Sequence, residues 1–97
     1  MSFYLSQQEA RTLLDQGGLV VDVRSVEEYT SGHAPGTLNL PLNLLPVMSK
    51  ERIAKGRPLL LCCASGARSA MAVEFLRPQG YDAHNLGSWV SHPDFSS

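Results

Sequence analysis

The chain alternates short apolar runs with polar segments that carry helix signals. Residues 19–23 and 59–62 are almost continuously apolar, which is typical of strands that are covered on both faces in a parallel sheet. Two further runs, residues 38–40 and 81–86, predict two more strands. Because these runs alternate with helix signals, we expect an α/β fold with a mainly parallel central sheet flanked by helices.

Helices are predicted by capping residues and by glycine stops. Residues 6–9 and 25–28 each have the Ser-x-x-Glu pattern of a capping box, in which the serine and the glutamate satisfy backbone N–H groups at a helix start. Gly17 and Gly32 can end these two helices. Weaker signals predict a helix over residues 49–55, and a further helical stretch over residues 69–77 follows the apolar run 59–62 and its loop.

Length and charge limit the function classes. Ninety-seven residues suit one compact domain over residues 1–97 and exclude a two-domain enzyme. The 8 basic and 9 acidic side chains leave a net charge of -1, which argues against nucleic acid or an anionic membrane as the dominant partner. No apolar run approaches the roughly 20 residues that cross a bilayer, and the first residues lack the basic start of a secretory signal. We therefore expect a cytoplasmic protein.

The cysteines predict free-thiol chemistry. The two cysteines of the chain, Cys62 and Cys63, are adjacent, and a disulfide between them would strain the intervening peptide bond. We therefore expect no disulfide framework. Cys62 lies inside an apolar run and is expected to be a buried small hydrophobe. The histidines and cysteines together lack the spacing of a zinc site, so no metal is predicted.

Cys63 stands at the end of the apolar run 59–62, where the ligands of an open α/β sheet tend to bind. Small residues, which let the backbone curl so that successive amide groups point into the hollow of the loop, follow it: Ala64, Ser65, Gly66 and Ala67. The next helix adds the positive end of its dipole. This cradle should bind anions and should lower the pKa of Cys63, which makes Cys63 the candidate nucleophile.

Arg68 closes the loop with a positive charge and several N–H donors that suit sulfonate, sulfate or phosphate. A thiolate that is already stabilised by amides needs no general base. The simplest target is the sulfur of a thiosulfonate or persulfide, which would leave Cys63 as a persulfide. A nucleophilic acceptor would then remove the added sulfur.

Three ordered motifs resemble the rhodanese family of sulfurtransferases. Residues 21–24 (VDVR), followed by Glu28 and Tyr29, are similar to the family's DVR…EY segment. Residues 32–41 (GHAPGTLNLP) resemble its GHIPGAINIP motif, and residues 63–69 (CASGARS) resemble its CRSGNRS active-site loop. The order and spacing of the three motifs make the resemblance more specific than the loop alone.

The resemblance implies a rhodanese fold and a two-step transfer through a Cys63 persulfide, with the amides of residues 64–68 and Arg68 holding the donor's anionic end. It implies a small-molecule donor, a thiol or cyanide as the acceptor, and no metal or organic cofactor. Thioredoxin-like and sulfur-relay proteins stay open as partners. Asp22 is implied to lie near the loop and to support it, although a purely structural role is equally compatible with the sequence, and Arg24 and Glu28 are implied to make structural polar contacts.

The sequence also departs from the family pattern. Ala64 and Ala67 stand where relatives often carry a cation or a polar residue, so the positive field rests on Arg68 and the backbone dipoles, and thiosulfate is expected to be a poor donor. Two other functions stay open: a non-catalytic or partner-dependent sulfur-relay or regulatory module, and a phosphatase or arsenate reductase. The last is disfavoured because four residues separate Cys63 from Arg68, whereas the phosphatase loop has five.

Overall fold

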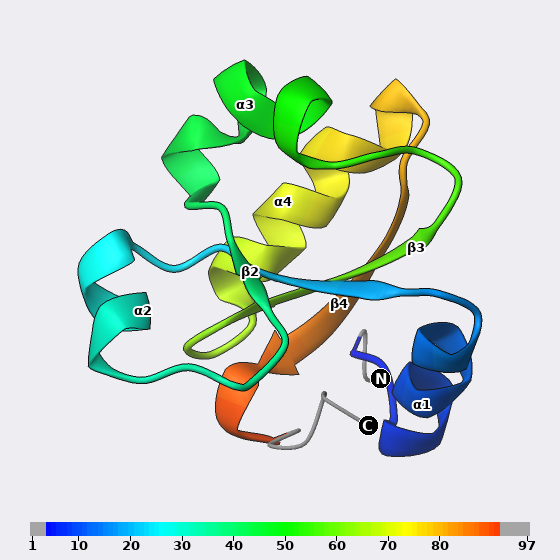
Figure 1. Cartoon of the computed structure of the whole chain (residues 1–97), viewed down its shortest axis with the longest axis horizontal. Coiled ribbons are helices and arrows are strands. Elements are labelled where there is room, and N and C mark those ends of the chain that lie inside the picture. Colours follow the sequence, from blue (N-terminus) through cyan, green and yellow to red (C-terminus); the bar gives the residue numbers. More distant parts are fainter. Residues whose placement is uncertain (1–3, 92–97) are drawn as a thin grey trace.

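The computed structural model describes residues 4–91, and its centre is a four-stranded sheet in the order β2-β1-β3-β4 (Figure 1). All three strand pairings are parallel, so the expected α/β fold with a parallel central sheet is confirmed. The strands are β1 (Leu19–Asp22), β2 (Leu38–Asn39), β3 (Pro58–Cys63) and β4 (Asp82–Ser88).

Four α-helices and three short 3-10 turns connect the strands in the described part of the chain. The helices are α1 (Gln7–Asp15), α2 (Val26–Ser31), α3 (Leu45–Arg52) and α4 (Ala67–Leu76), and the 3-10 turns are η1 (Leu42–Leu44), η2 (Arg77–Gln79) and η3 (Trp89–Ser91). None of these helices is long and apolar enough to cross a membrane.

Both predicted capping boxes are present. The Ser6 hydroxyl accepts from the Glu9 amide at 3.1 Å, and the Ser25 hydroxyl accepts from the Glu28 amide at 3.2 Å. In each case the glutamate side chain accepts in return from the backbone amide of the serine. These reciprocal hydrogen bonds fix where α1 and α2 begin.

Two helices have boundaries that differ from those predicted. We expected the third helix over residues 49–55, but α3 begins at Leu45, because Pro46 in its first turn has the fixed φ that suits a helix start. It ends at Arg52, since Ile53 is extended. Helix α4 begins at Ala67 and not at residue 69, which places Arg68 in its first turn.

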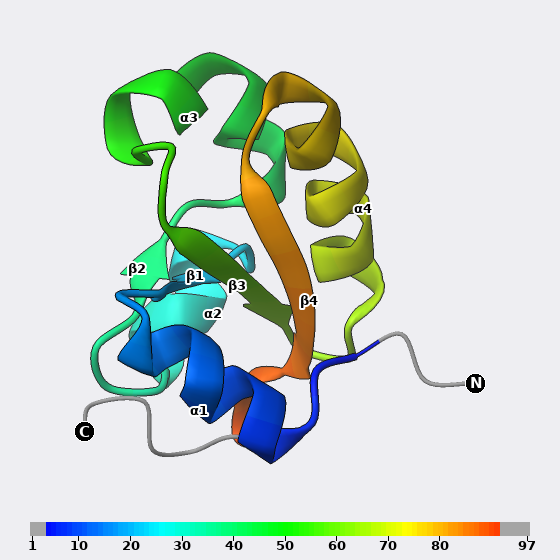
Figure 2. The same ribbon diagram turned by 90° about the vertical axis from the view of Figure 1, so that its right-hand side faces the viewer.

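Helices α1 and α4 lie on opposite sides of the sheet (Figure 2), and the strands bury different side chains on its two faces. Leu59, Leu61 and Cys63 of β3 join the core cluster that includes residues of α3 and α4, whereas Leu60 and Cys62 join the cluster that contains Ala10 of α1. This alternation follows from the two-residue period of a strand. Because all six residues of β3 are buried, helices must cover the sheet on both sides.

The edge strand β4 has a bulge next to the end of β3. Its register with β3 shifts so that Leu61 pairs with Asn85 but Cys62 pairs with Gly87, which leaves Leu86 as an extra residue. Gly87 takes a positive φ of 93°, which glycine adopts without steric cost. Bulges of this kind redirect side chains near functional sites, and this one lies beside Cys63.

Replacement of the core residue Leu59 tests this packing. Leu59 is fully buried, so Leu59→Ala should lower the free energy of unfolding by about 2–5 kcal/mol through lost burial and a cavity. Urea denaturation would measure the change. The matched control is Leu44→Ala, since Leu44 is 36% exposed, and it should cost less than about 1 kcal/mol. Equal losses in the two variants would contradict the assignment of Leu59 to the core.

Candidate active site

Cys63 lies where β3 ends and the loop to α4 begins. Cys63 is only 1% exposed to solvent. The amide of Gly66 donates a hydrogen bond to its Sγ atom at 2.9 Å. The Ser69 hydroxyl lies 3.5 Å from the same sulfur. The expected curl of the loop around the sulfur is therefore present, with donors from both the loop and the first turn of α4.

Gly66 makes this curl possible. It adopts a left-handed φ of 103° at the N-terminus of α4, a conformation that L residues with a Cβ rarely adopt. A Cβ at this position would also stand 2.6 Å from the hydroxyl oxygen of Tyr4. Position 66 therefore requires glycine for its backbone conformation, and a Cβ there would also displace the ring of Tyr4.

The loop lowers the pKa of Cys63. Burial by itself opposes ionisation, but hydrogen bonds from the Ser69 hydroxyl and from the amides of Ser69, Gly66 and Ser65 outweigh it, so that the pKa lies below its usual range. Hydrogen bonds to the charged form of a group have this effect in general. The site therefore favours the thiolate, which is the nucleophilic form of cysteine.

Cys62 has the opposite character. It is fully buried on the α1 side of the sheet, as expected for a small hydrophobe. Burial, reinforced by the negative charge of Asp22, raises the pKa of Cys62 far above its usual range. The two adjacent thiols thus lie on opposite faces of the sheet, and the one in contact with the loop is Cys63.

Ser69 and Asn85 complete the surroundings of the sulfur, and neither was predicted as a site residue. The Ser69 hydroxyl lies 2.7 Å from Asn85 Oδ1 and 3.1 Å from the Gly66 carbonyl oxygen. The Asn85 amide nitrogen donates to the same Gly66 oxygen at 3.1 Å, and Oδ1 accepts from the Gly87 amide. Asn85 therefore ties the loop to the bulge in β4. A polar residue inside an apolar strand was the one sequence signal that could have indicated it.

Arg68 does not stand alone at the loop. Its Nη1 and Nη2 atoms donate to the two carboxylate oxygens of Glu28 at 2.6 and 2.9 Å. This hydrogen bonding holds the pKa of Glu28 at about 2, and it raises the pKa of Arg68. We expected a free cation here, whereas the structure shows a bidentate ion pair whose side chains are 37% and 39% exposed.

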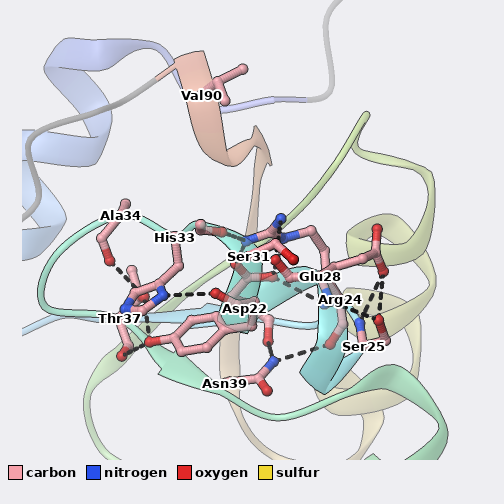
Figure 3. A network of polar contacts seen from close by, with 12 residues as sticks. Asp22, Arg24, Ser25, Glu28, Ser31, His33, Ala34, Thr37, Asn39 and Val90 are labelled. Carbon is pink, nitrogen blue, oxygen red and sulfur yellow. Dashed lines mark hydrogen bonds and ion pairs between the residues drawn. The ribbon is translucent and has the colours of Figure 1, made fainter.

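Asp22 pairs in register with Cys62, so the two side chains point to the same face of the sheet, and Figure 3 shows the polar contacts around Asp22. It is fully buried, and its carboxylate accepts from Arg24 Nη2 at 2.8 Å and from the Arg24 amide. Among the described residues, its side-chain hydrogen bonds go to Arg24, and none reaches the loop 63–68. Arg24 in turn donates to the carbonyl oxygens of Glu28 and Gly32. The link between Asp22 and the loop is therefore indirect.

The two histidines within residues 4–91 have partners other than Cys63. His33 stacks on Tyr29 with ring centroids 3.8 Å apart, and His84 pairs with Asp82. His92 lies outside the described residues. Within residues 4–91 there is no group of three or more His, Cys, Asp or Glu side chains that could hold a metal ion.

Comparisons with known proteins agree with this geometry. A rhodanese-like domain model matches residues 6–91. The chain is 42% identical to a sulfurtransferase of Allochromatium vinosum, over 79% of this chain and 68% of that protein. It is 33% identical to a putative sulfur carrier protein of Bacillus subtilis, over 69% of this chain but only 36% of that protein.

Solved structures share the fold. A rhodanese-like domain protein of Staphylococcus aureus superposes with a TM-score of 0.77 at 28% identity, over 96% of this chain and 93% of that one. A human single-domain sulfurtransferase superposes with a TM-score of 0.71 at 29% identity, over 90% of each chain. The family model covers nearly all of the described residues, and the chain therefore belongs to the rhodanese-like domain family.

Proposed function

We propose that this protein is a sulfurtransferase that carries sulfur as a persulfide on Cys63. The observation that carries the proposal is the hydrogen bond from the Gly66 amide to Cys63 Sγ at 2.9 Å, in a chain of the rhodanese-like family. A buried sulfur with amide donors around it is a stabilised thiolate. The name of the Allochromatium relative, a sulfurtransferase, supports the same reaction class.

In the first half-reaction the Cys63 thiolate attacks the outer sulfur of a donor. With thiosulfate, a bond forms between Sγ and the outer sulfur, the donor's S–S bond breaks, and sulfite leaves with the electron pair. With a thiol persulfide, the leaving group is the thiolate of the donor. In both cases the product is a Cys63 persulfide, and no external oxidant or reductant is needed.

The loop supplies the electrostatic part of this step. In this proposal the amides of residues 64–68 line the curl, which the amide hydrogen bonds from Ser65, Gly66 and Ser69 to Cys63 Sγ support, and the N-terminal end of α4 adds its positive dipole. These groups hold negative charge on the attacking sulfur, on the persulfide and on the leaving group. In this proposal the guanidinium of Arg68, at the mouth of the loop, binds the anionic end of the donor.

In the second half-reaction a nucleophile attacks the terminal sulfur of the persulfide and restores the Cys63 thiolate. Cyanide would yield thiocyanate, and a thiol would yield a new persulfide. A thioredoxin-like or sulfur-relay protein could present that thiol. The name of the Bacillus relative, a putative sulfur carrier protein, supports a relay as the setting of the reaction.

Asp22 has a supporting role in this proposal. Its ion pair with Arg24 is nearly fully buried, with side-chain exposures of 1% and 5%. Arg24 also lies 4.4 Å from the centre of the Trp89 ring. By holding the backbone of α2, this pair positions Glu28 and, through Glu28, Arg68. Asp22 is thus a structural support of the loop's mouth and has no part in the transfer itself.

Loss of the nucleophile is the direct test. Cys63→Ser should retain the fold and abolish sulfur loading, because a serine hydroxyl is not ionised at neutral pH. Intact-mass measurement after thiosulfate or persulfide treatment, before and after cyanide, would detect the gain and loss of one sulfur atom. The matched control is Cys62→Ala, which should still load because Cys62 faces the other side of the sheet. Loading of Cys63→Ser would refute the proposal.

The pH dependence should respond to Ser69. Because hydrogen bonds to the thiolate lower the pKa of Cys63, Ser69→Ala should raise that pKa. The thiolate fraction at neutral pH then falls, and the lost rate returns at higher pH. Thiolate absorbance, measured as the difference from Cys63→Ser, and the pH profile of kcat/KM would both report the shift. Ser65→Ala is the control, since Ser65 contributes through its amide; an unshifted profile in folded Ser69→Ala would contradict the assignment.

Donor affinity should depend on Arg68. We expect Arg68→Ala to raise the KM for thiosulfate roughly tenfold with a smaller effect on kcat, because a charge-assisted contact to the donor is lost. Steady-state kinetics with cyanide as acceptor would measure both constants. Arg57→Ala is the control, because Arg57 precedes the opposite end of β3 and donates to the Gly17 carbonyl. An unchanged KM in Arg68→Ala would remove Arg68 from the donor site.

A further inference from the structure

The Glu28 carboxylate is hydrogen-bonded to the guanidinium group of Arg68, which the proposed reaction needs to bind an anionic donor. Both carboxylate oxygens accept from the two terminal nitrogens of Arg68, at 2.6 and 2.9 Å. This bidentate arrangement has the geometry that a sulfonate group of a donor would need. Because the two side chains are 37% and 39% exposed, a donor can reach the pair, and it must then compete with Glu28 for the same N–H groups.

Glu28 is held in place independently of Arg68. The amide and hydroxyl of Ser25 donate to Glu28 Oε1 at 3.0 and 3.1 Å (Figure 3). These contacts belong to the capping box of α2. The carboxylate is thus preorganised by its own helix, so pairing with Arg68 costs little side-chain freedom. The ion pair is therefore more stable than is usual for exposed side chains.

The charges nearest the loop cancel. Asp22 pairs with Arg24, and Glu28 pairs with Arg68, so these four side chains contribute no net charge. The other loop side chains between Cys63 and Arg68 are uncharged. Because its guanidinium is bonded to Glu28, Arg68 offers no free positive charge, and a donor anion depends on the backbone amides and the dipole of α4 unless it displaces the carboxylate from Arg68.

We propose, resting on the sulfur transfer proposed above, that Glu28 is a specificity-determining residue that selects sulfur donors by charge. By holding Arg68, it favours donors with a single negative charge, such as a thiol persulfide, over the dianion thiosulfate. Glu28 touches neither the reacting sulfur nor the leaving bond, and it acts through the guanidinium of Arg68.

Two small donors isolate the effect of charge. Thiosulfate carries two negative charges and releases sulfite, whereas methanethiosulfonate carries one and releases methanesulfinate. In both, Cys63 Sγ bonds to the outer sulfur while the adjacent S–S bond breaks, so the chemistry of the transfer is the same. The measured quantity is the ratio of kcat/KM for thiosulfate to kcat/KM for methanethiosulfonate, with cyanide as acceptor.

Glu28→Gln removes the charge and retains an oxygen that can accept from Ser25. We expect the ratio to rise about fivefold, which is the upper range for an exposed charge pair. Glu9→Gln is the matched control, because Glu9 has the same place in the capping box of α1 and makes no contact with Arg68; it should leave the ratio unchanged. In an Arg68→Ala background, Glu28→Gln should change the ratio by less than about twofold, since the effect passes through Arg68.

The outcomes separate this inference from the proposed function. An unchanged ratio in Glu28→Gln, in protein that loads sulfur on Cys63, would overturn the role of Glu28 and leave the sulfur transfer standing. A rise of the same size in the Arg68→Ala background would overturn the route through Arg68. Failure of the unmodified protein to load sulfur from either donor would overturn both proposals.

If Glu28→Gln does not fold, Glu28→Asp serves as the second variant. Its shorter side chain withdraws from the Arg68 guanidinium, so the kcat/KM ratio should again rise. No rise in folded Glu28→Asp would overturn the inference.

Discussion

The parallel pairing of β1 with β3 is the constraint on which the site depends. It places Asp22 beside Cys62 in register, and β3 is buried on both faces. Strand alternation then sends Cys62 toward α1 and Cys63 toward α4. One peptide bond therefore separates a thiol whose pKa is raised by burial from one whose pKa is lowered by the hydrogen bonds of the loop. A slip of one residue in this register would exchange the two.

The local parts of the structure could be predicted from the sequence. The strands, the two capping boxes and the loop after Cys63 follow from short-range patterns, and the structure reproduces them. Helix α3 begins earlier than the pattern predicts, because Pro46 in its first turn has the fixed φ that suits a helix start. The early start of α4 follows from the left-handed turn at Gly66.

The contacts that tune the site could not be predicted, because they join distant segments. Glu28 and Arg68 are 40 residues apart, and Ser69 and Asn85 are 16 apart. No short-range sequence pattern predicts contacts between residues so far apart in the chain. Asn85 reaches the loop because of the bulge at Leu86, a feature without a strong sequence signal. Arg68, which the sequence alone predicts as a free cation, is therefore paired with Glu28.

The polar groups of the site are fully committed to one another. Among the described residues, no buried side-chain nitrogen or oxygen lacks a hydrogen-bond partner. The Ser25 capping box serves both as the start of α2 and as the anchor of the Glu28 carboxylate. Networks of this kind hold a single geometry, which explains how a chain of 97 residues can preorganise a thiolate without a large core.

The placement of the two cysteines also decides how the protein responds to oxidants. A thiolate such as that of Cys63 is the form that peroxides convert to sulfenic acid, and a neighbouring thiol commonly rescues it as a disulfide. Cys62 is the one other cysteine in the chain, but it is buried on the far face of the sheet. An oxidised Cys63 therefore has no internal resolving partner, and its recovery depends on a thiol supplied from outside the chain.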